Sequence, residues 1–92
     1  MDKLEVAGKI FKLKYVDGLA DNGSVDFAQQ VVLINKNLTE EEKRSTILHE
    51  VIEILNSSYN LELSHQTIST LEIGLFSFFK YNSTFINKKK KG

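Results

Sequence analysis

The sequence contains no cysteine among its 92 residues. Disulfides and thiolate zinc sites are therefore excluded, and any bound metal would need histidine and carboxylate ligands. The chain also has no apolar run near the roughly 20 residues that span a bilayer, and the residues after Met1 lack the apolar core of a secretory signal. These absences predict a cytoplasmic protein without a membrane partner.

Several motifs of common functions are missing as well. The chain has no Gly-rich phosphate loop, no serine-nucleophile signature and no internal repeat. Its length corresponds to one domain with a modest core. We assign residues 1–82 to this domain and residues 83–92 to a tail.

The charge is unevenly distributed along the chain. Twelve basic and twelve acidic residues give a net charge of zero, but four of the basic residues form the run 88–91. Residues 1–87 therefore hold eight basic and twelve acidic residues, a net charge of −4. An acidic body argues against nucleic acid as the main partner. The lysine run is expected to be a disordered solvating end, with weak nonspecific contact to nucleic acid as the alternative.

The first half of the chain has the patterns of β-strands. Alternation places Phe11, Leu13 and Tyr15 on one face of the first strand. Residues 31–34 form a continuous apolar run, as expected of a strand covered on both faces. We expect a small antiparallel sheet of about three short strands, near residues 9–16, 25–27 and 31–34.

The second half of the chain predicts two long helices. Thr39 as N-cap and Glu42 three residues later form a capping box, and apolar periodicity continues to about residues 57–58. Ser64 can cap a second helix that ends at about residues 81–82. Helices after strands give an α+β fold.

The first predicted helix has a pattern that suits a metal site. His49 and Glu53 are four residues apart and therefore project side by side, and Glu50 follows on the same polar flank. In an H-E-x-x-H helix, two histidines hold zinc and the glutamate between them takes a proton from water at the metal. Here the second histidine is replaced by Glu53. A solvated helix face with the same spacing is the alternative.

The second predicted helix has two further candidates, His65 and Glu72. His65 takes the first helical position, where the dipole favours the neutral imidazole that metals bind. A charged Glu72 on an apolar face is costly unless it is paired or metal-bound. They lie about 10 Å apart along the axis, so at most one binds the same ion. The helical wheel groups them on one inward-facing sector with Ile68, Leu75, Phe76 and Phe79.

The chain resembles small phage- and prophage-encoded zincin-like proteins of the H-E-x-x-H metallopeptidase type. The resemblance covers about residues 9–82. It is carried by Gly23-Ser24-Val25-Asp26-Phe27, Gln30, Leu38-Thr39-x-Glu41-Glu42-Lys43, Thr46-Ile47-Leu48-His49-Glu50, Leu63-Ser64-His65 and Gly74-Leu75.

This resemblance implies a minimal metallopeptidase with a divalent metal, zinc in the first instance. It places His49 and Glu53 in the metal pair, Glu50 as general base, and His65 or, as a substitute, Glu72 as third ligand. The carboxylate at Glu53 should weaken the activation of water, and a more oxygen-rich site would suit manganese. An edge strand would align a peptide substrate.

A second function is consistent with the same residues. A phage protein of this fold in the cytoplasm of a bacterial host could bind and inhibit a host protein through its surface without catalysis. Four aromatic residues near the end of the second helix exceed what one helix face can bury. They predict core packing or, alternatively, a homodimer or partner surface. These residues are Phe76, Phe78, Phe79 and Tyr81.

Overall fold

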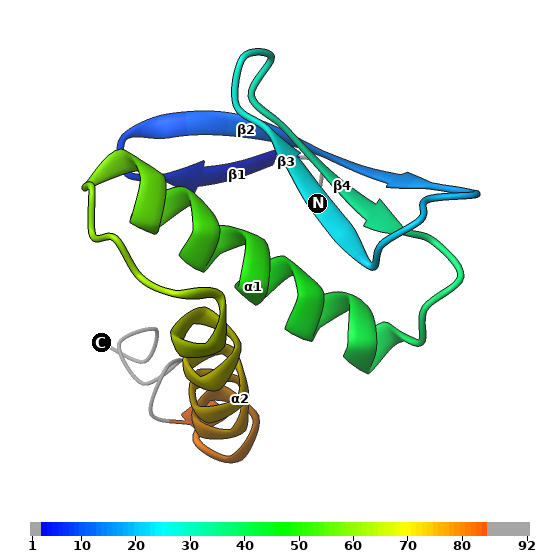
Figure 1. Cartoon of the computed structure of the whole chain (residues 1–92). Coiled ribbons are helices and arrows are strands. Elements are labelled where there is room, and N and C mark those ends of the chain that lie inside the picture. The colour runs from blue at the N-terminus through cyan, green and yellow to red at the C-terminus, as the bar shows by residue number, and fades with distance from the viewer. Residues whose placement is uncertain (1–2, 85–92) are drawn as a thin grey trace.

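Four strands form one sheet, followed along the chain by two helices, in a computed structural model that describes residues 3–84. The predicted α+β fold is confirmed. The lysine run and most of the predicted tail lie outside the described residues. The strands are β1 (Lys3–Val6), β2 (Lys9–Val16), β3 (Gly23–Asp26) and β4 (Val31–Asn35), in the spatial order β1-β2-β4-β3 (Figure 1).

The sheet is mixed, with one strand more than expected. The pairs β1–β2 and β3–β4 are antiparallel, but the central pair β2–β4 is parallel. The additional strand β1 joins β2 through a two-residue turn, in which Ala7 and Gly8 have φ of 54° and 76°. Such a turn normally carries Asn-Gly or Asp-Gly. Because Ala7 replaces that signal, the hairpin was not predicted.

The core lies between one face of the sheet and the first helix, α1 (Glu40–Ser58). Phe11 and Leu13 of β2 and Val32 and Ile34 of β4 meet Ile54 of α1 in the buried cluster. Within residues 3–84 no helix covers the opposite face of the sheet (Figure 1). The apolar run of β4 is therefore buried on one face only, and the prediction of cover on both faces was wrong.

Tyr15 departs from the pattern of its strand. It follows Phe11 and Leu13 in the alternation but stays 43% exposed. The ammonium group of Lys43 lies 5.3 Å from the centroid of its ring. The end of β2 therefore extends beyond the packed core, where a cation covers the aromatic face.

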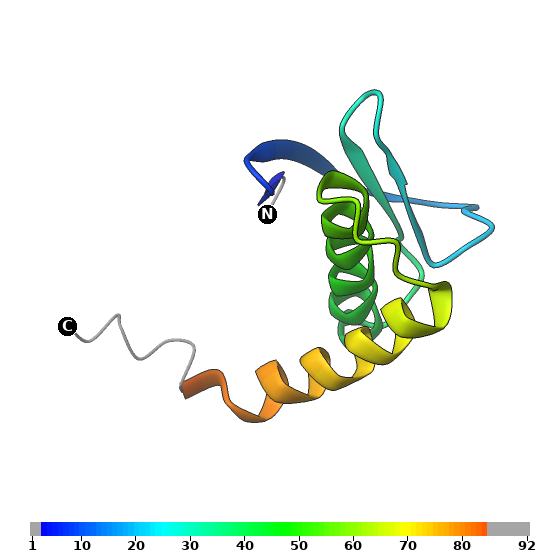
Figure 2. The same ribbon diagram turned by 60° about the vertical axis from the view of Figure 1, so that its left-hand side comes forward.

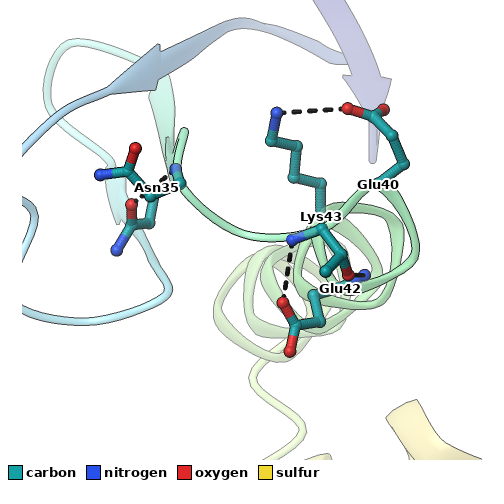
Figure 3. A network of polar contacts seen from close by, with 6 residues as sticks. Asn35, Glu40, Glu42 and Lys43 are labelled. Atoms are coloured by element: carbon teal, nitrogen blue, oxygen red, sulfur yellow. Dashed lines mark hydrogen bonds and ion pairs between the residues drawn. The ribbon is translucent and has the colours of Figure 1, made fainter.

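Helix α1 begins with the predicted capping box. The Thr39 hydroxyl accepts a hydrogen bond from the Glu42 amide at 3.1 Å, and the Glu42 carboxylate accepts one from the Thr39 amide at 2.9 Å. Figure 3 shows this network together with the ion pair of Lys43 and Glu40, at 3.3 Å. These bonds satisfy amides that have no partner within the helix. They fix where α1 begins, and with it the direction in which each side chain of α1 projects.

The second helix is α2 (His65–Tyr81), and Ser64 is its N-cap, as predicted. Within residues 3–84 it contacts α1 but not the sheet. The predicted inward-facing sector is confirmed only around Ile68, because His65 at its start is exposed. Ile68 is buried, whereas Leu75 and Phe79 are 38% and 43% exposed. The reason is that α2 crosses α1 and its second half projects beyond it (Figure 2). In residues 3–84, neither helix has the length and apolar character needed to cross a membrane.

Candidate metal centre

His49 and Glu53 lie side by side on α1, as their spacing predicted. His49 Nε2 and Glu53 Oε2 are 3.4 Å apart. This is long for a hydrogen bond from nitrogen to oxygen, which is usually 2.7–3.2 Å. Two ligands about 2.0–2.1 Å from one tetrahedral zinc ion lie roughly 3.3 Å apart. The spacing of the two atoms therefore matches ligands that share an ion.

His65 reaches the same point from α2. Asn56 accepts a hydrogen bond from the Leu63 amide at 2.9 Å, which ties the connector between the helices to α1. Ser64 then caps α2 by accepting from the Thr67 amide at 3.1 Å. As a result the His65 and His49 rings lie 5.8 Å apart, centroid to centroid. One ligand atom each from His49, Glu53 and His65 lies within 4.8 Å of the other two, so the group could hold a metal ion.

Glu72 has a different place. Its Oε1 lies 2.8 Å from His49 Nδ1, the ring nitrogen that faces away from Glu53, and its Oε2 accepts a hydrogen bond from the Ser45 hydroxyl at 2.5 Å. Both carboxylate oxygens therefore already have partners. Of the two candidates on α2, His65 lies in the group that could hold a metal ion, whereas Glu72 contacts the other ring nitrogen of His49.

Glu50, which was predicted on the polar flank of the helix beside His49 and Glu53, is buried beneath β3. It is 6% exposed. At Gly23, an added Cβ would lie 2.7 Å from Thr46 Cγ2 and 3.1 Å from Glu50 Oε2. Only a residue without a side chain allows β3 to pass so close to α1. Neither Gly23 nor Thr46 had been assigned this role, because the contact depends on how strand and helix pack.

Burial raises the pKa of Glu50 from the usual 4.5 to about 7. The charge of His49 acts in the opposite direction, and the nearby carboxylates of Glu53, Glu72 and Asp21 raise the pKa further. Desolvation disfavours the carboxylate because it removes water from a negative charge. A carboxyl group that titrates near neutral pH is well matched to proton transfer.

The raised pKa of Glu50 makes stability depend on pH in the metal-free protein. Below pH 4.5 the group is protonated in both folded and unfolded chains. Between pH 4.5 and about 7 only the unfolded chain ionises, so stability falls as pH rises, and above about 7 the loss is complete. We expect Glu50→Gln to be more stable than wild type by about 2 kcal/mol at pH 8, because the neutral glutamine removes the cost of burying a carboxylate charge.

Urea denaturation of both proteins with chelator at pH 4 and pH 8 measures this difference. The gain should disappear at pH 4, where both side chains are neutral. An equal gain at both pH values would show that the glutamine acts through packing and not through the charge.

The candidate ligands line a cleft of about 740 Å³ between β3, the loop before it and the two helices. Its wall includes Val25 and Phe27 on one side and Glu50 on the other. In the described part of the chain no lysine or arginine lines this cleft. The cleft thus combines an apolar wall, buried acid and a group of possible metal ligands.

The comparisons with known proteins add no family to this geometry. Neither the protein-family models, nor the curated proteins, nor the solved structures gave a match to the chain.

Proposed function

We propose that this protein is a minimal metal-dependent peptidase of the zincin-like type found in phages and prophages, acting in the bacterial cytoplasm. One observation carries the proposal. His49 and Glu53 of α1 and His65 of α2 converge beside the buried Glu50, in the cleft between β3 and the two helices. The resemblance of residues 9–82 to zincin-like proteins supports the same function.

The donor set favours zinc over harder ions. Two histidines and one glutamate are a known ligand set of catalytic zinc sites, which keep a fourth position open. In the H-E-x-x-H pattern both histidines come from one helix. Here Glu53 takes the place of the second histidine, and His65 of α2 supplies the missing imidazole. The set of ligands is therefore kept, although its order along the chain differs.

The roles of the residues follow from their positions. When bound, zinc would lower the pKa of a water molecule and polarise a substrate carbonyl. Glu50, which faces the cleft and titrates near neutral pH, would accept the proton of the attacking water and pass it to the leaving amine. The closeness of β3 to α1 keeps bulk water away from this carboxyl group.

The substrate would be an extended peptide. Strand β3 is at the edge of the sheet and, within residues 3–84, pairs only with β4, so its outer backbone groups could pair with a further strand. Val25 and Phe27 line the cleft at this edge, and Phe27 is 47% exposed. A peptide added beside β3 would pass the candidate ligands and could place an apolar side chain against Phe27.

Removal of metal tests the proposal. We expect the purified protein to contain about one zinc per chain by elemental analysis. With zinc at 100 times its Kd, binding adds about 2.7 kcal/mol, which for a domain of this size raises Tm by at least about 10 °C. Chelator should abolish that increase, and His49→Ala should be insensitive to chelator. Absent metal together with an unchanged Tm would contradict the proposal.

A second candidate function is protein binding without catalysis, in which the protein inhibits a host protein. The exposed apolar residues of the second half of α2 favour it, since monomeric proteins rarely expose many such side chains together. Leu75, Phe79 and Tyr81 are between 38% and 74% exposed. A metal-free protein with an unchanged Tm would favour this candidate.

A further inference from the structure

We propose that Glu72, held by Ser45, is a positioning residue that fixes the ring of His49 so that its Nε2 faces Glu53 and His65. This inference rests on the proposed metal site. The three residues are called the Ser45–Glu72–His49 network below.

Hydrogen-bond chemistry assigns the protons in this network. A carboxylate only accepts, so the Ser45 hydroxyl must donate to Oε2 of Glu72, and His49 Nδ1 must carry the proton that is shared with Oε1. In the neutral ring this leaves the lone pair on Nε2. That nitrogen lies 3.4 Å from Glu53 Oε2, on the side of the ring where an ion held by His49 and Glu53 would bind. Glu72 therefore selects the tautomer that a metal requires.

Burial makes the orientation of the network specific. The side chains of His49 and Glu72 are only 18% and 22% exposed, so water replaces neither partner easily. Ser45 takes up the second oxygen of Glu72, which stops the carboxylate from rotating away from the ring. A metal-ligating histidine commonly donates its other N–H to a carboxylate, which fixes the ring orientation.

The network also links the two helices at the site. His65 and Glu72 both come from α2 and both lie close to His49: the His65 ring is 5.8 Å from its ring, centroid to centroid, and Glu72 Oε1 is 2.8 Å from its Nδ1. Any shift of α2 along α1 would move both at once. The packing of α2 thus sets the third ligand and the orientation of the first ligand together.

The alternative is that Glu72 only helps to hold α2 on α1. A second polar contact between the helices, from Lys80 to Glu41 at 2.7 Å, provides the matched control. Lys80→Met removes this contact far from His49. Glu72→Met keeps the length of the side chain but has no acceptor for Nδ1.

Two measurements separate positioning from packing. In the zinc-free protein, ¹⁵N NMR of the neutral ring should show His49 with its proton on Nδ1. Glu72→Met should shift the proton toward Nε2 and weaken zinc binding by about 10–100-fold, the usual cost of losing such a partner. Lys80→Met should change neither the tautomer nor the zinc Kd, although it lowers stability. Glu72→Gln, which retains an acceptor oxygen, should recover part of the zinc affinity.

The outcomes distinguish this inference from the proposed function. If Glu72→Met keeps both the tautomer and the zinc Kd of wild type, the positioning role is wrong and the metal site stands. If wild type binds no zinc, the proposed function fails, and the tautomer alone decides whether Glu72 positions the ring. Should Glu72→Met fail to fold, Ser45→Ala replaces it. A mixed tautomer would then support the network, and an unchanged tautomer with unchanged zinc Kd would overturn it.

Discussion

Replacement of Glu50 by glutamine is expected to lower peptide turnover by about 10²–10⁴-fold, the usual contribution of a general base. Glutamine has nearly the same shape but cannot accept the proton of the attacking water. The metal ligands are His49, Glu53 and His65 in the proposed site, so the variant should contain as much zinc as wild type. Cleavage of a fluorescence-quenched peptide library, measured with zinc content on the same samples, tests both expectations.

The matched control is Glu5→Gln. Glu5 is an exposed glutamate on β1, at the edge of the sheet opposite β3, so its replacement changes the charge equally without touching the cleft. It should leave turnover unchanged. Equal turnover in Glu50→Gln and wild type would remove Glu50 from the role of base, even if zinc binding were retained.

Exchange of the proposed ligands at positions 53 and 65 is expected to produce the second large effect, a change in zinc affinity. His65→Ala should weaken zinc binding by at least about 100-fold, because even the loss of a residue that only hydrogen-bonds to a metal ligand costs about 10–100-fold. His65→Glu leaves one imidazole and two carboxylates, a set that suits zinc less well. Addition of Glu53→His to His65→Glu restores two histidines and one glutamate, and the zinc Kd should return to near the wild-type value.

Competition with a coloured zinc chelator measures the Kd of each variant. A glutamate at position 65 is also compatible with the first turn of α2, where the helix dipole favours negative charge. Poor folding is therefore not expected to mask the result. Unchanged zinc affinity in His65→Ala would show that His65 is not a ligand. A double variant as weak as His65→Glu would show that the two positions do not exchange roles.

Local signals in the sequence were sufficient for the helices. The capping box of Thr39 and Glu42 and the cap at Ser64 depend on side chains within three residues of the backbone they bind, and both are present as predicted. The strands and their pairing were harder to predict from the sequence. The parallel pairing of β2 with β4 joins residues about 19 apart, and no local pattern specifies such a pairing. The short strand β1 is followed by Ala7-Gly8, which lacks the Asn or Asp of the usual hairpin turn.

The candidate site likewise has features that the local sequence predicts and features that depend on tertiary packing. The approach of His49 to Glu53 follows from the helical repeat alone, because residues four apart always share a face. The burial of Glu50 does not follow from the helical repeat, because it depends on β3 passing over α1 at Gly23. Ser45 could not be recognised as part of the site, because its partner Glu72 is on another helix.

The sequence by itself therefore determined which residues on α1 could act together and where both helices begin. Only the tertiary structure showed which of the two alternatives on α2, His65 or Glu72, lies with His49 and Glu53 in a group that could hold a metal ion. The physical reason is that helical periodicity is a local property, whereas the crossing of α2 over α1 is set by packing around Ile68 and by the connector held at Asn56. That crossing brings His65 to the ligand group and turns Glu72 toward the other nitrogen of His49.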